Sequence, residues 1–367
     1  MKKKILMISN SFYSLSLFRI ELLTELNKEY EIFLFCPIDK KAGDKPEQFE
    51  AMNIHTKSMV MDRRSTDPFK ELKLCREIKS YIKEIMPDIV ITLTIKPNIY
   101  AGFACADLGI PYIANVTGLG TAFNTDNLLK KITVALYKRA LRKCNMVFFE
   151  NSENKRIMEE CGILKGPSTV TTGAGVNLDR FVKKPYPDKD NETYLFIGRL
   201  MKEKGIEEFL NSAERMKEKY PETRYIVVGF YEESYEERVK SLIEKGIIEY
   251  HSFTSRPEEY YEKCSALVQP SYHEGMSNVC LETAATGRPI LVSDIPGCRE
   301  TVLDGVSGFT FKSGSSEDLY NAMERFHQLP YEDKIKMGEA GRVHMEKCFD
   351  RKEVVRTHMS VIKDIIG

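Results

Sequence analysis

Short apolar segments alternate with longer amphipathic segments along the whole chain. The short segments are rich in β-branched residues, as buried strands are, and the longer ones repeat apolar positions every three or four residues, as helices do. This alternation is typical of βαβ units, in which helices pack on parallel sheets. The expected strands are 4–8, 31–35, 88–93, 111–116, 146–149, 168–172, 194–197, 225–228, 247–251, 266–269 and 289–292.

The clearest helix signal begins at Asp67 and Pro68, a capping residue followed by a proline at the first helical position. From Phe69 to Ile85, apolar side chains recur at three- and four-residue spacing. We therefore expect one long amphipathic helix in this part of the chain.

A polar segment divides the expected strands into two sets. Residues 183–193, KKPYPDKDNET, hold two prolines and a dense run of charges, and they offer few apolar contacts that could fix the backbone. The chain of 367 residues is also long enough for about two domains of ordinary size. We expect two doubly wound α/β domains, at 1–175 and 193–349, joined by a linker at 176–192.

The formal net charge of zero conceals two halves of opposite sign. The chain holds 54 basic and 54 acidic residues, but residues 1–180 hold 27 basic and 21 acidic ones, and residues 181–367 hold 27 and 33. The first half is therefore the one suited to an anionic partner, although we expect no nucleic acid among the partners.

No apolar run is long enough to cross a bilayer, and the run near the N-terminus stops at Ser9, which is too short for a signal peptide. The nine cysteines occur singly, without the spacing or the histidine neighbours of a zinc site. We expect a soluble cytoplasmic protein with reduced thiols and no bound metal.

The turn after the first expected strand, SNSFYSLSLFR, contains no glycine. Dinucleotide-binding turns and P-loops both need glycines there, so that the backbone can approach phosphates. The turn therefore argues against an oxidoreductase or epimerase that binds NAD. Its last residue, Arg19, either faces a ligand or lies on the surface of a solvated loop.

The first strand of the second set runs into FIGRLMKEKG. Gly198 allows close approach of the backbone, the Arg199 guanidinium can bind phosphate through two N–H groups, and Lys204 adds a point charge. A diphosphate suits this combination, although surface salt bridges are the more usual role of such residues.

Two glutamates, Glu274 and Glu282, follow in QPSYHEGMSNVCLETAATGRPI. A helix that begins near Ser277 puts Glu282 in its second turn and leaves Glu274 in the preceding loop. The backbone N–H groups of Gly275, Met276, Ser277 and Asn278 then lie at the N-terminus of a helix, which attracts anions. Two solvated carboxylates are the alternative interpretation of this spacing alone.

Together, EGMSN at 274–278, ETAATGRPI at 282–290, Gly297 and Gly308-Phe309 resemble the retaining GT-B glycosyltransferases of family four, over nearly the whole chain. The resemblance implies two Rossmann-like domains facing a cleft, with the helix at 350–367 crossing back to the first domain. It implies that 193–349 binds the nucleotide-sugar donor and 1–175 the acceptor, without a metal or cofactor.

The same resemblance implies roles for individual residues. Glu274 contacts the donor sugar and Glu282 the ribose, while Arg199 and Lys204 neutralise the diphosphate. The residues expected around the donor are Gly198, Gly275, Met276, Ser277, Asn278, Val279, Thr117 and Gly118.

Thr117 and Gly118 belong to a run, Thr-Gly-Leu-Gly, whose glycines let the backbone approach a sugar; an ordinary tight turn is the alternative. This part resembles the members that extend a saccharide on undecaprenyl diphosphate in bacterial capsule, O-antigen or glycan synthesis. A UDP-linked hexose or N-acetylhexosamine is then the expected donor. A non-catalytic nucleotide-sugar binding protein remains the alternative.

The segment NLLKKITVALYKRALRKC, at 127–144, holds six cations and no acid. Helical spacing places Leu129, Ile132, Leu136 and Ala140 on one face. Without the resemblance, a core-facing helix with a solvated basic side is the simpler interpretation. Given the resemblance, we expect docking on the inner face of the cytoplasmic membrane and contact with the acceptor. The residues assigned to this role are Arg19, Lys130, Lys131, Lys138 and Arg139.

Overall fold

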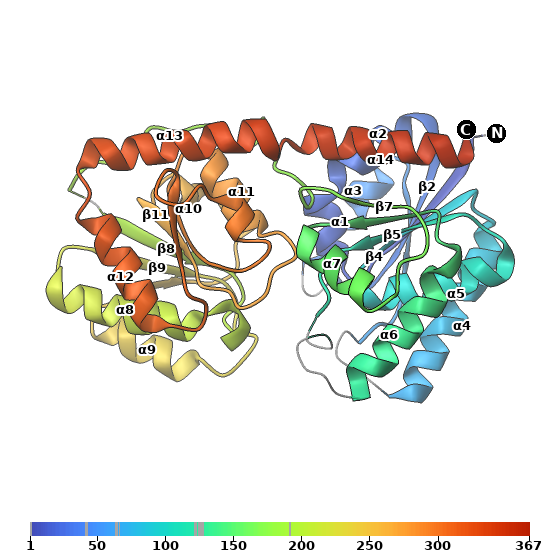
Figure 1. Ribbon diagram of the computed structural model, residues 1–367, viewed down its shortest axis with the longest axis horizontal. Coiled ribbons are helices and arrows are strands. Elements are labelled where there is room, and N and C mark those ends of the chain that lie inside the picture. The colour runs from blue at the N-terminus through green and yellow to red at the C-terminus, as the bar shows by residue number, and fades with distance from the viewer. Residues whose placement is uncertain are drawn as a thin grey trace. The chain divides into compact units, whose positions relative to one another are not determined.

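The computed structural model describes residues 2–40, 43–62, 65, 67–120, 123, 128–190 and 192–367. The chain forms two compact units (Figure 1). Unit 1 consists of Met1–Ala174 with Glu353–Gly367, and unit 2 of Gly175–Lys352. No helix in the described ranges combines the length and the apolar character that a membrane crossing needs.

The described part of unit 1 is built on a seven-stranded parallel sheet in the order β3-β2-β1-β4-β5-β6-β7. Six of its strands confirm the expectation to within one or two residues, and β3 was not expected. Its four residues, HTKS, lie at the edge of the sheet and are mostly exposed, so they carry no apolar signal. The strands are β1 (Lys4–Ile8), β2 (Glu31–Cys36), β3 (His55–Ser58), β4 (Ile89–Leu93), β5 (Tyr112–Val116), β6 (Met146–Phe149) and β7 (Ser168–Val170).

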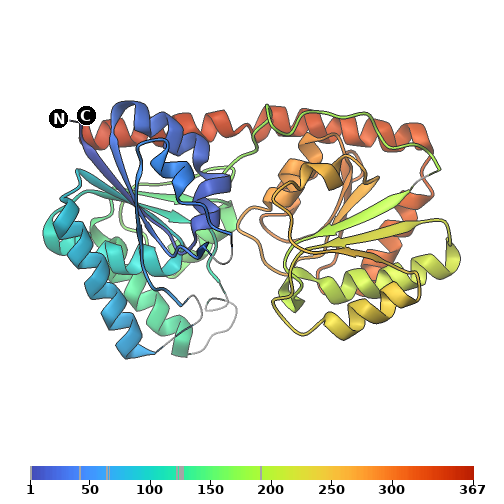
Figure 2. The same cartoon turned by 180° about the vertical axis from the view of Figure 1, so that it is seen from behind.

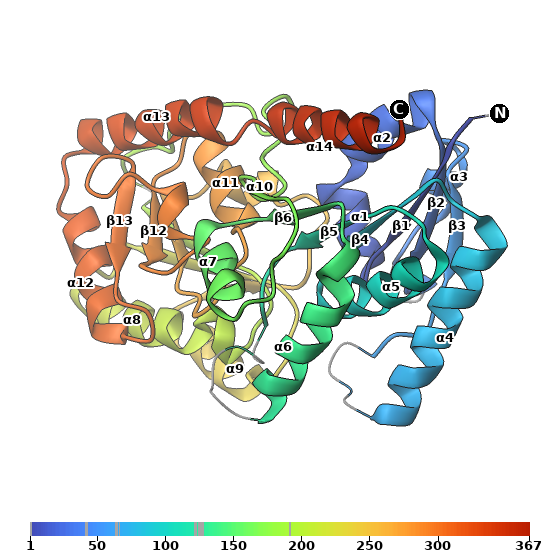
Figure 3. The ribbon, with the colours of Figure 1, turned by 45° about the vertical axis from the view of Figure 1, so that its right-hand side comes forward.

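Helices cover both faces of this sheet (Figure 3). One core holds side chains of α4, α5, α6 and α7, and the other holds side chains of α1, α2 and α14. The C-terminal helix therefore contributes to unit 1, as the fold prediction requires. The helices are α1 (Phe12–Phe18), α2 (Ile20–Glu29), α3 (Glu47–Glu50), α4 (Pro68–Ile85), α5 (Ile95–Leu108), α6 (Leu128–Ala140), α7 (Ser152–Glu160) and α14 (Arg351–Ile366).

Helix α4 begins where the sequence predicts, because the Asp67 carboxylate accepts a 2.9 Å hydrogen bond from the Phe69 N–H. Its buried side is narrower than expected, however. Leu74, Ile78 and Ile82 are buried, whereas Phe69 is 85% exposed. The first turn of α4 therefore carries an apolar side chain that no core covers.

Unit 2 repeats the architecture of a sheet covered by helices (Figure 2). Among the described residues, its sheet is parallel and has six strands, in the order β10-β9-β8-β11-β12-β13. Five strands confirm the expectation, and β13 was not expected. The core on one face of the sheet holds side chains of α8, α9 and α12, and the core on the other face holds side chains of α11 and α13. The strands are β8 (Thr193–Ile197), β9 (Arg224–Val228), β10 (Glu249–His251), β11 (Ala266–Gln269), β12 (Ile290–Ser293) and β13 (Gly308–Phe311). The helices are α8 (Ile206–Lys219), α9 (Glu236–Glu244), α10 (Glu258–Tyr261), α11 (Asn278–Ala285), α12 (Ser316–His327) and α13 (Tyr331–Cys348).

The segment proposed as a linker, 176–192, packs on unit 2 instead of standing free of both units. The Arg288 guanidinium is fully buried and donates to the carbonyl oxygens of Lys184 and Pro185, at 3.1 and 2.7 Å. The Tyr186 hydroxyl donates to the Ser265 carbonyl oxygen at 2.8 Å. A buried guanidinium needs acceptors, and the backbone of this polar segment supplies them.

Candidate functional site

The candidate site of unit 2 lies where β8 and β11 end, because parallel strands present their carboxyl ends at one edge of a sheet. Gly205, with φ +72°, ends the turn after β8, and a Cβ there would lie 2.0 Å from the Pro270 carbonyl oxygen after β11. Only glycine fits such a close approach at positive φ. The packing of these two turns brings Lys204 and Glu274, 70 residues apart, into contact.

The Lys204 ammonium lies 2.5 Å from Oε1 of Glu274, and both side chains are mostly buried. The same oxygen accepts hydrogen bonds from Ser271 Oγ at 2.8 Å and Gln269 Nε2 at 3.1 Å. A carboxylate with this set of donors is fixed in place, and it carries a negative charge beside a positive one.

Arg199 takes a different partner. Its Nη1 lies 3.5 Å from Oε1 of Glu232, and the side chain is 40% exposed. The neighbouring Gly198 is closely packed through its backbone, since a Cβ at Gly229 would lie 1.8 Å from its carbonyl oxygen. Arg199 therefore lies at the carboxyl end of β8 and forms a partly exposed salt bridge. A surface salt bridge was the alternative to phosphate binding that the sequence left open.

The loop at 274–278 leads into α11 as expected, with Ser277 as the capping residue. The Ser277 N–H donates to the Gly297 carbonyl oxygen at 2.8 Å, and a Cβ at Gly297, with φ +83°, would lie 2.5 Å from the Gly275 carbonyl oxygen. Met276 is buried in the core, so only its backbone is available to a ligand. Asn278 and Val279 form the first turn of the helix.

Glu282 lies in α11 and is 8% exposed, so it is not a solvated carboxylate. The Tyr261 hydroxyl donates to its Oε2 at 2.9 Å. Burial raises the pKa of Glu282 to about 7, although the Tyr261 hydrogen bond and the charges of Arg351 and Arg180 lower it. This carboxyl group changes its charge near neutral pH.

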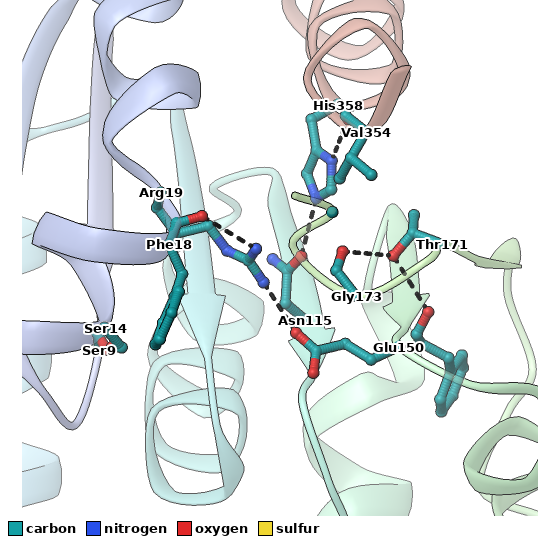
Figure 4. A network of polar contacts seen from close by, with 12 residues as sticks. Ser9, Ser14, Phe18, Arg19, Asn115, Glu150, Thr171, Gly173, Val354 and His358 are labelled. Carbon is teal, nitrogen blue, oxygen red and sulfur yellow. Dashed lines mark hydrogen bonds and ion pairs between the residues drawn. The ribbon is translucent and has the colours of Figure 1, made fainter. Parts of the chain in front are cut away.

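In unit 1, Arg19 is buried and does not lie on the surface of a loop (Figure 4). Its Nη2 lies 3.0 Å from Oε1 of Glu150, which directly follows β6. Sequence reasoning missed Glu150. The available signal was a single carboxylate at the end of the apolar strand MVFF, a position that faces the ligand edge of a parallel sheet.

A second polar contact in Figure 4 joins α14 to β5. His358 Nε2 lies 2.9 Å from Asn115 Oδ1, and Nδ1 lies 2.8 Å from the Val354 carbonyl oxygen. The ring also stacks on Phe148, with centroids 4.1 Å apart. Burial, together with the charge of Arg19, lowers the pKa of His358 to about 4. No sequence signal links His358 to a strand 243 residues away.

Thr117 and Gly118 directly follow β5. Gly118 has φ +155°, and apart from its two chain neighbours no heavy atom of the described residues lies within 4 Å of the place of its Cβ. The Glu150 N–H donates to the Val116 carbonyl oxygen at 3.4 Å, so this turn and Glu150 are neighbours.

Helix α6 buries Thr133, Tyr137 and Ala140, and a Cβ at Gly102 of α5 would lie only 3.0 Å from the Ala140 carbonyl oxygen. Of the apolar face predicted from helical spacing, Ala140 is therefore buried, whereas Leu129 and Ile132 are exposed. Leu128 is 72% exposed. Close packing of α5 on α6 requires small or flat side chains, and the side chains of Leu128, Leu129 and Ile132 are neither.

The expected cations lie along the same helix. Lys131, Lys138 and Arg139 are exposed, and Lys130 is half-buried. The Arg139 guanidinium also lies 5.3 Å from the centroid of the Phe103 ring. Among the described residues, no group of three His, Cys, Asp or Glu side chains is arranged to hold a metal ion.

Two family models match consecutive parts of the chain. The model described as Glycosyl transferase 4-like matches residues 4–151, and the model described as Glycosyl transferases group 1 matches residues 179–344. Together they cover every strand of the two sheets except β7.

Individual proteins agree with these models. The chain is 24% identical to the N,N'-diacetylbacillosaminyl-diphospho-undecaprenol alpha-1,3-N-acetylgalactosaminyltransferase of Campylobacter jejuni, over 98% of each protein. It is 26% identical to the capsular polysaccharide biosynthesis glycosyltransferase CapM of Staphylococcus aureus, over 44% of this chain and 43% of that one.

A solved structure shows the fold. The crystal structure of HepE of Anabaena in complex with UDP-glucose matches with a TM-score of 0.80 at 16% identity, over 98% of this chain and 99% of that one. The chain thus has the GT-B fold and belongs to the group 1 glycosyl transferases, the retaining family four that its motifs resemble.

Proposed function

We propose that the protein transfers a hexose or N-acetylhexosamine from a UDP-linked donor to a saccharide carried on undecaprenyl diphosphate, in the synthesis of a bacterial surface polysaccharide or glycan. The observation that carries this proposal is the contact between Lys204 and Glu274 beside the first turn of α11. A cation, a carboxylate and backbone N–H groups at one edge are complementary to the diphosphate and the hydroxyls of a nucleotide sugar.

Unit 2 binds the donor in this proposal. Lys204 and Arg199 neutralise the diphosphate, Glu274 accepts hydrogen bonds from sugar hydroxyls, and Glu282 accepts them from the ribose. Gly198 and the backbone from Gly275 to Val279 line the same site. The complex of HepE with UDP-glucose supports a uridine donor for this fold.

The reaction breaks the bond between the anomeric carbon and the diphosphate and forms one to the acceptor oxygen. Lys204 and Arg199 stabilise the negative charge that develops on the departing diphosphate, which is the main catalytic contribution of such a site. The acceptor attacks from the face that the diphosphate leaves, and a phosphate oxygen takes the acceptor proton. No metal ion takes part in this mechanism.

Unit 1 binds the acceptor in this proposal, and Arg19 contacts it. The turn at Thr117 and Gly118, at the carboxyl edge of the same sheet, is assigned to the donor sugar. The relative in Campylobacter jejuni, whose name gives a diphospho-undecaprenol acceptor, supports a lipid-linked substrate. We further propose a cytoplasmic enzyme that docks on the inner membrane face through α6. Lys130, Lys131, Lys138 and Arg139, here called the α6 cations, lie on the helix whose first turns expose Leu128, Leu129 and Ile132.

A screen of UDP- and GDP-sugars against an undecaprenyl-diphosphate-linked monosaccharide tests the substrates, with product mass as the readout. We expect a product one hexose or N-acetylhexosamine heavier, from a UDP-sugar. A product from GDP-sugars alone refutes the choice of base. Thermal shift by UDP, GDP and NAD tests the ligand class, and stabilisation by NAD alone contradicts the whole proposal.

A further inference from the structure

Three hydrogen-bond donors from three residues meet at one oxygen of Glu274. Lys204 Nζ lies 2.5 Å from Oε1, Ser271 Oγ 2.8 Å and Gln269 Nε2 3.1 Å. Of these donors only Lys204 carries a charge. Three donors occupy the lone pairs of this oxygen, so it is held in place by the protein itself.

The two neutral donors lie at the end of a strand and just after it. Gln269 is the last residue of β11 and is 3% exposed, and Ser271 is fully buried two residues later. Gln269 Nε2 also donates to Ser271 Oγ at 2.7 Å, and Ser313 Oγ donates to the Ser271 carbonyl oxygen at 3.2 Å. Their positions are therefore set by the sheet, independently of any ligand.

The orientation of the Gln269 amide has a cost. Its Oε1 is buried and has no hydrogen-bond partner among the residues that the structure describes, and leaving a buried acceptor unpaired costs about 1–3 kcal/mol. Rotating the amide would direct this oxygen at the Glu274 carboxylate. The observed orientation is thus the one that serves Glu274 and Ser271.

Lys204 differs from these donors because it has a second task in the proposed reaction. Its ammonium has three N–H donors on a flexible stem, and the departing diphosphate competes with Glu274 for them. If Lys204 alone held Glu274, the carboxylate would shift whenever the ammonium turned to the diphosphate.

We propose that Gln269 and Ser271 are positioning residues for glycosyl transfer, which hold the Glu274 carboxylate in a fixed orientation while Lys204 interacts with the diphosphate. The inference rests on the proposed role of Glu274 at the donor sugar. UDP lacks the sugar, so its binding does not depend on this orientation.

The test compares Ser271→Ala and Gln269→Leu with the wild type. One assay measures UDP release from whichever UDP-hexose or UDP-N-acetylhexosamine the wild-type protein uses fastest, and the other measures the Kd of UDP. We expect kcat to fall by about ten- to hundredfold, as for a lost hydrogen bond to a charged group, with the Kd of UDP within about twofold of the wild type. Ser271→Thr keeps the hydroxyl and should recover most of kcat.

Two residues of the same unit provide matched controls. Ser293 ends β12, the strand next to β11, and Thr283 lies in α11. The hydroxyl oxygens of both are buried and have no hydrogen-bond partner within the described part of the chain. Like Ser271→Ala, the variants Ser293→Ala and Thr283→Val remove a buried hydroxyl group. Neither residue is a hydrogen-bond donor to Glu274, so both variants should keep kcat within about twofold.

The outcomes separate this inference from the function on which it rests. If Glu274→Ala lowers kcat while Ser271→Ala and Gln269→Leu leave it within twofold, the positioning role is wrong and the proposed function stands. If both variants weaken UDP binding by as large a factor as they lower kcat, and also lower Tm, their role is structural and the inference is also overturned. If Glu274→Ala itself has no effect on kcat, the proposed function fails.

Discussion

Glu282 should make the stability of unit 2 depend on pH, and replacement by glutamine should remove that dependence. The pKa of Glu282 is raised from 4.5 to about 7 because the side chain is buried. A carboxyl group with a raised pKa in the folded state stabilises the fold fully below its unfolded pKa, and this contribution is lost as the pH rises from about 4.5 to 7. At 1.36 kcal/mol per unit, the loss is about 3 kcal/mol.

The glutamine variant stays neutral and keeps the shape of the side chain, so it does not undergo this loss. We expect the difference in free energy of unfolding, Glu282→Gln minus wild type, to rise by about 3 kcal/mol between pH 4.5 and pH 8. His358 in unit 1, with its pKa lowered to about 4, is present in both proteins and cancels from the difference.

The assay is urea denaturation at several pH values, followed through the transition that UDP shifts, because two units can unfold separately. The control is Glu222→Gln, the same substitution at an exposed glutamate of the same unit. The predicted pH dependence is refuted if the difference in free energy of unfolding between Glu282→Gln and wild type stays constant within about 0.5 kcal/mol from pH 5 to pH 8.

Three further predictions concern charged groups. Lys204→Ala should weaken UDP binding by about tenfold or more, measured by calorimetry, since it removes a cation from the proposed diphosphate site; an unchanged Kd contradicts that role. Arg19→Met should destabilise unit 1 by about 3 kcal/mol, because the Glu150 carboxylate stays buried without its ion-pair partner. In urea denaturation, the double variant Arg19→Met, Glu150→Leu should be more stable than Arg19→Met and recover much of this loss. Replacement of the α6 cations by glutamate should reduce sedimentation of the protein with anionic vesicles and leave UDP binding unchanged. If the variant sediments as much as the wild type, the membrane proposal is wrong.

The alternation of segments predicted most of the strands to within one or two residues. It missed β3, because HTKS is an exposed edge strand, and it also missed β13, although the residues of β13 are mostly buried. Helical spacing placed Leu129, Ile132 and Ala140 on one face of α6, but of these three only Ala140, where α5 packs, is buried. The pattern of one helix records which residues are apolar, but the neighbouring helix decides which of them are covered.

The residues of the site could be predicted as separate motifs, but their partners could not. Glu274 and Lys204 were each expected at the donor, and neither the bond between them nor the support from Gln269 and Ser271 follows from spacing. Which strands are neighbours decides these contacts, and the sequence contains strand order only indirectly. The same reason explains why Glu150 and His358 were missed.

The two units share an arrangement that spacing did not show. In each, a cation in the segment after the first strand meets a carboxylate that follows a later strand: Arg19 meets Glu150, and Lys204 meets Glu274. Each pair has a net charge near zero, so neither attracts a diphosphate strongly from a distance. In the proposed function, binding of a diphosphate at Lys204 then depends on short contacts, to which N–H groups at the N-terminus of α11 can add. The excess of basic charge in residues 1–180 lies partly in the α6 cations, three of which are exposed, and attraction to an anionic surface can act there over longer distances.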